Sequence, residues 1–204
     1  MILSSVVRSS DRCKRLLAIV MVQAYTCTIR TSNQLHRDSA GGPKLLTRVL
    51  AILSAILFSL SGALVDRALV ATSAWQQLGV QAWADFSRHA DNGPGLILYP
   101  IWGIAAWLAA LATALTFRLD PRAPRSARVP IYVAAAASIG AAAATLKAAP
   151  MMLSVGHLAN GSSAMREVFD QFTFWGVYVR GFLFVIGFIA SVLAVAALGN
   201  GRKN

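Results

Sequence analysis

Four long apolar stretches alternate with polar segments from residue 45 onward. They run over residues 49–65, 95–117, 130–149 and 177–198. Each is about twenty residues long, the length at which a helix rising about 1.5 Å per residue crosses a hydrocarbon core of roughly 30 Å. Backbone polar groups in lipid must find their hydrogen bonds within the same segment, so the pattern predicts helices. The expected fold is therefore all-α, a membrane four-helix bundle.

The polar segment between the first two stretches predicts a further, amphipathic helix. Five of its residues recur at intervals of three or four and so fall on one helical face: Trp75, Leu78, Ala82, Phe86 and His89. Trp83 lies beside that face. We expect this helix to lie at the outer membrane interface, with its tryptophans among the lipid headgroups.

Residues 1–43 differ from the rest of the chain, because they mix Arg, Ser and Thr with one short apolar patch at residues 16–22. Basic residues precede the patch, as in a signal peptide, but the patch is too short to span and no good cleavage site follows it. We expect a basic cytoplasmic tail, either disordered or arising from a misassigned start, before a membrane domain of residues 44–204.

The composition agrees with a membrane protein. The chain is 56% hydrophobic and 13% charged, with a mean hydropathy of +0.58, whereas soluble domains carry about a quarter charged residues. The net charge of +11 raises the question of nucleic-acid binding, but the basic residues do not share one face interleaved with aromatics. They lie between the apolar stretches, and we expect no nucleic-acid partner.

The distribution of basic residues also predicts an orientation. They gather before the first stretch, between the second and third, and after the fourth: Lys44, Arg48, Arg118, Arg122, Arg125, Arg128, Arg202 and Lys203. The two longer polar segments, 66–94 and 150–176, carry fewer. Since positively charged segments stay in the cytoplasm, we expect a multi-pass protein of the plasma (inner) membrane with both termini cytoplasmic.

Metal or cofactor chemistry is not indicated. Cys13 and Cys27 have no CxxC spacing and no histidine at zinc-finger distance. His89 and His157 lack the close pairing that metal sites built on a helix use. We therefore expect no metal and no cofactor.

The two ionisable residues within the apolar stretches, Lys147 and Arg180, both fall at the predicted outer end. Arg180 lies three residues into the fourth stretch, Lys147 lies near the end of the third, and Asp66 follows the first. An arginine at the bilayer centre costs about 2.5–3.5 kcal/mol, and less near the interface. Two interpretations stay open: the three residues pair and fix the helix register, or they line an outward-opening polar pocket.

Aromatic residues at the same level would form the walls and lid of such a pocket. They are Trp75, Trp83, Tyr99, Trp102, Trp175 and Tyr178. A mostly apolar pocket with a few convergent polar groups is the usual form of a small-molecule site. Aromatic residues at this depth also form ordinary interfacial belts, so the pattern is compatible with both interpretations.

Two segments carry a resemblance to a known family. They are "TLKAAPMMLSV" at residues 145–155 and "FDQFTFWGVYVRGFLF" at residues 169–184. With four apolar stretches and a long first outer segment, the chain resembles the anthrone-oxygenase-like family of membrane proteins over residues 45–198. Asp170, Trp175 and Arg180 match the pattern of that family.

The resemblance implies oxygenation of a polycyclic phenol without a cofactor. A base would remove a proton, and cationic groups would hold the resulting carbanion or enolate while O₂ reacts. Arg180 and Lys147 would hold the anion, His89 or Asp66 would be the base, and Asp170 would contact the substrate.

The alternative is a non-enzymatic membrane protein, either a binder of lipid or of a hydrophobic small molecule, or an accessory or transport subunit. Proton-coupled export is disfavoured, because no Asp or Glu lies within an apolar stretch. In either case the expected partners are membrane lipid and a hydrophobic or aromatic small molecule, and the oligomeric state is not indicated.

Overall fold

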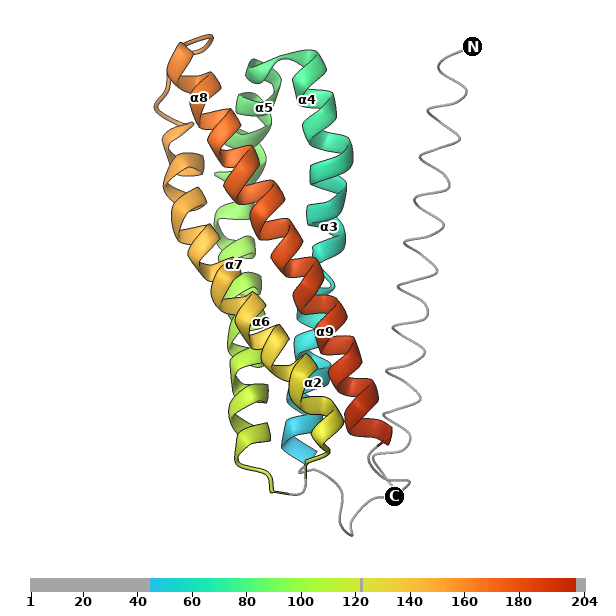
Figure 1. Ribbon diagram of the computed structural model, residues 1–204. Helices are drawn as coiled ribbons and strands as arrows, with labels where there is room; N and C mark the ends of the chain where they lie inside the picture. Colours follow the sequence, from blue (N-terminus) through green and yellow to red (C-terminus); the bar gives the residue numbers. More distant parts are fainter. Residues whose placement is uncertain (1–44, 122, 201–204) are drawn as a thin grey trace, which may run out of the picture.

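The computed structural model describes residues 45–121 and 123–200, and every regular element within them is helical. Four helical columns run alternately up and down along a common axis (Figure 1). Four helices are long and apolar enough to cross a membrane. The predicted all-α membrane bundle is therefore confirmed. The expectations for residues 1–43 lie outside the described residues.

The first column is longer than the predicted stretch. It comprises α2 (Leu45–Phe58), α3 (Ser61–Asp66), the π-helical segment η1 (Arg67–Ala71) and α4 (Thr72–Leu78). The chain then reverses at Gly79, whose φ of 96° and ψ of 158° lie where residues with a side chain are strained.

The second column descends beside the first. Its elements are α5 (Val80–Phe86), the π-helical segment η2 (Ser87–Asp91) and α6 (Gly95–Arg118). Because Gly79 divides the predicted amphipathic helix in two, α4 and α5 form a hairpin that stands upright and extends the bundle (Figure 1). In this detail the structure differs from the prediction, which was a single amphipathic helix lying at the outer membrane interface.

The third and fourth columns complete the bundle. Their elements are the short 3₁₀ helix η3 (Arg125–Ala127), α7 (Arg128–Ser154), α8 (Ser163–Phe172), the π-helical segment η4 (Thr173–Val179) and α9 (Arg180–Asn200). The Ser162 hydroxyl accepts a hydrogen bond from the Met165 N–H at 3.2 Å and so caps α8. The third apolar stretch was expected to end before Pro150, but α7 continues through this exposed proline. The missing N–H of a proline removes only one bond of the helix.

The columns are longer than a bilayer is thick. The first covers 34 residues and the fourth 37, which at about 1.5 Å per residue gives lengths of roughly 50–55 Å. A hydrocarbon core is about 30 Å thick, so part of the bundle must project beyond it. We call the end formed by α4, α5 and α8 the capped end, and the end that carries Arg118, Arg125 and Arg128 the basic end.

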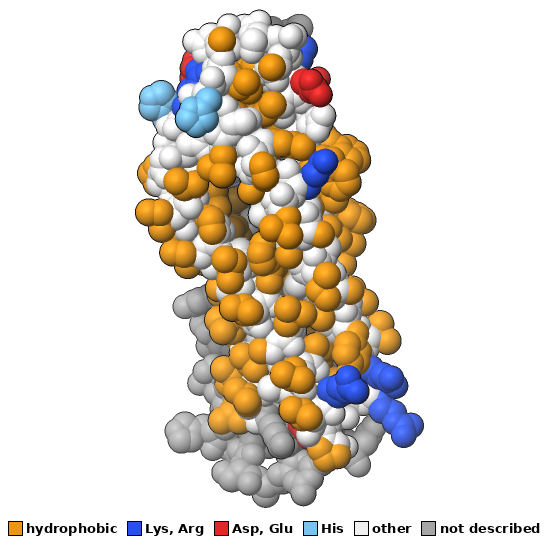
Figure 2. Space-filling view, turned by 90° about the vertical axis from the view of Figure 1, so that its left-hand side faces the viewer, with side chains coloured by type: hydrophobic (Ala, Val, Ile, Leu, Met, Phe, Trp, Pro, Cys, Tyr) orange, Lys and Arg blue, Asp and Glu red, His pale blue; other side chains and the backbone are white. Residues whose placement is uncertain are grey.

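Large hydrophobic side chains cover the outside of the columns, and small ones fill much of the middle. Figure 2 shows a broad belt of hydrophobic side chains between two ends that carry charge. Leu108 and Leu146 are 61% and 79% exposed, as expected for residues that face lipid. Inside, the Ser54 and Ser191 hydroxyls share a hydrogen bond of 3.0 Å. Small and hydroxylated residues let membrane helices approach closely.

Candidate functional site

A buried ion pair joins the first two columns at the capped end. The Arg67 guanidinium makes two hydrogen bonds to the Asp91 carboxylate, Nη1 to Oδ1 at 2.9 Å and Nη2 to Oδ2. The side chains of Arg67 and Asp91 are only 12% and 3% exposed. Two parallel bonds of this kind combine charge with a fixed geometry, so the pair fixes where both groups lie.

Aromatic rings surround the Arg67 guanidinium on several sides. Its central carbon lies 5.4 Å from the ring centroid of Trp75 and 5.6 Å from those of Phe86 and Phe172. The Trp75 and Phe86 rings also pack against each other at 5.2 Å. Cation–π contacts at this range are favourable, most of all where water is excluded.

Arg180 adds a second positive charge to this pair. It begins α9, and its charge interacts with those of Arg67 and Asp91 and with Tyr99. Its Nε is buried and has no hydrogen-bond partner among the described residues. Asp91 therefore forms an ion pair with Arg67 and attracts Arg180 electrostatically. We call Arg67, Asp91 and Arg180 the arginine cluster.

Other buried polar atoms at the capped end also lack a hydrogen-bond partner within the described residues. They are Arg67 Nε, Gln81 Oε1, Trp83 Nε1, Ser87 Oγ and Asn92 Oδ1. A buried polar group left without a partner costs about 1–3 kcal/mol, so such groups are usually satisfied. These five residues belong to η1, α5, η2 and the turn that directly follows η2.

Three π-helical segments meet the arginine cluster. Arg67 is the first residue of η1, Asp91 is the last of η2, and Arg180 directly follows η4. The Thr72 hydroxyl donates to the Arg67 carbonyl at 2.8 Å within the widened turn of η1. Segments of this type are rare and often lie at functional sites.

The structure brings some of the predicted site residues to the cluster. Trp75 is buried beneath Arg67, and Tyr99 lies within electrostatic range of Arg180. Trp83 is fully buried, with its ring 5.2 Å from that of Phe169 and 5.9 Å from that of Phe172.

Three further aromatic residues of the predicted site lie on α6 and η4. The Trp102 Nε1 donates to the Leu57 carbonyl at 2.7 Å, where α2 ends. Trp175 is partly buried and packs edge-on against Phe174 at 5.2 Å, and Tyr178 is 46% exposed.

Four of the predicted polar residues lie on the surface of the bundle. Asp66, Lys147, His89 and Asp170 are exposed. The His89 Nδ1 lies 2.8 Å from the Asp85 carbonyl oxygen within its own helix. The buried carboxylate at this end is Asp91 rather than Asp66, and it pairs with Arg67, which was not among the predicted site residues.

The sequence interpretation missed the importance of Arg88. This side chain donates to the carbonyls of Val155 at 3.2 Å and Leu158 at 2.9 Å and to the Asn160 side chain at 2.8 Å. It therefore ties η2 to the segment that follows the C-terminal end of α7. No spacing in the sequence marks these contacts, because the partners lie 67–72 residues further along the chain.

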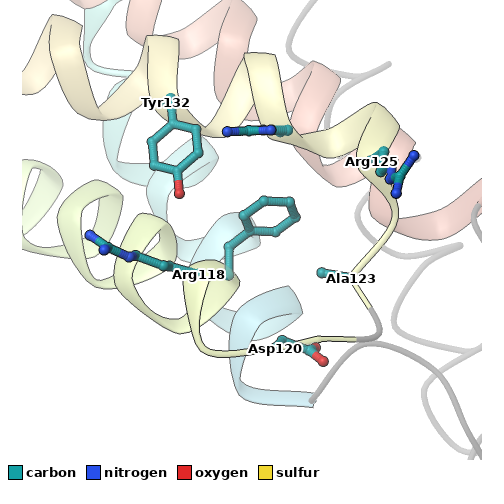
Figure 3. Close-up of a pocket in the computed structure, with 7 residues that line it drawn as sticks. Arg118, Asp120, Ala123, Arg125 and Tyr132 are labelled. Atoms are coloured by element: carbon teal, nitrogen blue, oxygen red, sulfur yellow. The ribbon is translucent and has the colours of Figure 1, made fainter.

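No group of three His, Cys, Asp or Glu residues that could hold a metal ion occurs in the part of the chain that the structure describes. A cleft of about 510 Å³ lies at the basic end, between α6 and α7 (Figure 3).

Comparison with known proteins found no similar family model, no similar curated protein and no similar solved structure.

Proposed function

We propose that this multi-pass membrane protein binds a hydrophobic organic anion at the arginine cluster. The observation that carries the proposal is Arg180, a guanidinium at the edge of the membrane whose buried Nε has no hydrogen-bond partner among the described residues. Charged groups within membrane proteins usually pair with another charge or line a wet cavity. Asp91 is already engaged by Arg67, so an anionic ligand would supply the charge that the cluster lacks.

The chemistry around the cluster favours a ligand with an apolar or aromatic body. The Arg67 guanidinium lies over the rings of Trp75, Phe86 and Phe172. Tyr99, Phe174 and Tyr178 are 43%, 52% and 46% exposed on the outer surface of the same region. A ligand dissolved in the bilayer would reach the cluster along these rings.

The proposed location is the plasma (inner) membrane, with the capped end outside and both termini in the cytoplasm. The support is the arginine-rich segment at the basic end, which the positive-inside rule assigns to the cytoplasm. Membrane lipid is then the surrounding partner.

If the protein is an enzyme, the family resemblance implies that it oxygenates the bound molecule without a cofactor. A methylene group next to a polycyclic phenol would lose a proton, and the carbanion would add O₂ to give a hydroperoxide. Loss of water then leaves a carbonyl, so that CH₂ and O₂ become C=O and H₂O. Arg180 would hold the anion, the kind of electrostatic role that contributes most to catalysis. The non-enzymatic alternative is binding and release of the same class of molecule unchanged.

Native mass spectrometry of the protein in mild detergent tests the proposal. We expect the wild type to carry a co-purifying anion and R180Q to lose it. R166Q is the matched control, since Arg166 is an exposed arginine on α8 at the same end, and it should keep the ligand. Detection of the same species in all three proteins, or of no ligand in any, would contradict the proposal.

Oxygen uptake then separates the enzyme from the binder. If the wild type consumes one O₂ for each ligand molecule and forms a quinone, oxygenation is supported. If the ligand is recovered unchanged under oxygen, the protein binds it without reaction.

A further inference from the structure

We propose a second binding site at the basic end, which takes the phosphate headgroup of an anionic membrane lipid. This site is independent of the arginine cluster and of the function proposed for it. It is the cleft of about 510 Å³ between the end of α6 and the beginning of α7 (Figure 3).

Positive charge dominates the cleft. Arg118, Arg125 and Arg128 line it and are exposed. Asp120 also lines it, but this carboxylate is buried and has an interaction of its own. Three arginines therefore line the cleft against one carboxylate. Guanidinium groups match the oxygens of a phosphate with pairs of parallel hydrogen bonds, which makes phosphate the best anion for this cleft.

Two aromatic side chains shape the inner wall. The Tyr132 ring stands edge-on to Phe117, with centroids 6.2 Å apart and an interplanar angle of 86°. In Figure 3 the Tyr132 hydroxyl points into the space between the two helices, with Arg118 and Arg125 at different sides of the opening. A phosphate held by the arginines would accept a further hydrogen bond from this hydroxyl.

The position of the cleft favours a lipid over a soluble phosphate. Arg118 ends the apolar run of α6, so the cleft lies where the hydrocarbon core gives way to headgroups. Leu119 and Val129, each the next residue after a cleft arginine, are 64% and 70% exposed. The exposed apolar side chains can contact the acyl chains of a lipid while the basic cleft binds its headgroup. Basic pockets between membrane helices bind anionic lipids in this way.

Lipid retention in nanodiscs tests this site with the full chain. The discs contain phosphatidylcholine with increasing phosphatidylglycerol, and native mass spectrometry counts the anionic lipid that stays bound after release into detergent. We expect R125Q to weaken phosphatidylglycerol binding roughly fivefold, and a triple R118Q/R125Q/R128Q variant about a hundredfold, at about 1 kcal/mol for each arginine near the surface. R166Q removes one exposed arginine at the other end and should change nothing.

A triple substitution of the same arginines by lysine guards against a misfolded variant, because it keeps the charge and loses only the paired hydrogen bonds. We expect it to bind phosphatidylglycerol with intermediate affinity and to keep the wild-type circular dichroism spectrum. Equal retention by the wild type and the triple glutamine variant would overturn the proposal. Displacement of the lipid by millimolar inorganic phosphate would also overturn it, since the occupant would then be a soluble phosphate.

Discussion

Arg67 and Arg180 carry the same kind of charge but meet very different surroundings. Arg67 has a bidentate carboxylate partner and three aromatic rings around it. Arg180 is repelled by Arg67 and attracted by Asp91 and Tyr99, and its buried Nε has no hydrogen-bond partner among the described residues. Removing one partner of a buried pair and removing an excess charge should therefore have opposite effects on stability.

Asp91→Asn tests the first half of that contrast. The substitution leaves Arg67 buried without its counter-charge, so we expect the free energy of unfolding to fall by about 3–5 kcal/mol. Asp85→Asn is the matched control on the same hairpin, because the Asp85 side chain is 56% exposed in its pair with Arg88. Its cost should stay within about 1 kcal/mol. Denaturation in mixed micelles measures both, and similar losses for the two variants would contradict a buried, energetically important pair.

Among single residues, the sequence singled out Arg180 but not the ion pair of Arg67 and Asp91 beside it. Arg180 stands out because it interrupts an apolar stretch. Asp91 does not, since it lies in a polar segment 24 residues after its partner Arg67. The pairing depends on how the hairpin at Gly79 folds back, and local spacing carries no information about that reversal.

The three π-helical segments determine which side chains of the first, second and fourth columns point toward the arginine cluster. A π turn holds one more residue than an α turn, so each segment rotates the side chains that follow it. In η4 the backbone also passes close to an aromatic ring: a Cβ added at Gly176 would lie 2.7 Å from Phe172. Phe172 in turn lies against the Arg67 guanidinium. The glycine therefore allows the ring to reach the cluster.

Gly176→Ala should disturb this element. The added methyl group forces the Phe172 ring to move, which we expect to lower the free energy of unfolding by about 1–3 kcal/mol. Gly103→Ala is the control, because a Cβ at this buried position of α6 would meet the Trp107 ring at an ordinary 3.7 Å. Thermal unfolding in detergent compares the two, and equal midpoints would show that Phe172 can shift freely.

The number and order of the four spans were predictable, while their lengths and joints and the helix α8 were not. Apolar runs of the right length define spans because lipid tolerates few other structures. The extension of the first column to Leu78 escaped prediction, because Asp66 and Arg67 resemble the polar flank of a span. Asp66 ends α3 and Arg67 begins the π-helical segment η1, through which the helix continues, and hydrophobic periodicity does not reveal such a turn.

The whole molecule is a bundle whose capped end projects beyond the bilayer in the proposed orientation. Columns of roughly 50 Å exceed a core of about 30 Å by some 20 Å. The arginine cluster then lies near the junction between the lipid-facing and projecting parts. A ligand that dissolves in the membrane but carries charge would concentrate at this level.

Cysteine labelling in intact cells tests the projection and the orientation together. In a background where Cys13 and Cys27 are serine, Q77C on α4 should react with a membrane-impermeant maleimide from outside. S126C at the basic end should react only after permeabilisation, and L108C, which faces lipid, should react poorly in both cases. The reverse pattern for Q77C and S126C would show the opposite orientation.

The most direct test of the central claim is the unfolding free energy of R180Q, measured beside D91N in ligand-free protein. If Arg180 is an excess cation kept for an anionic ligand, its removal should leave stability unchanged or raise it by up to about 3 kcal/mol, the cost of an arginine within a membrane. D91N should be destabilised in the same measurement. A loss in R180Q as large as that in D91N would contradict the account, because Arg180 would then be a structural member of the ion network.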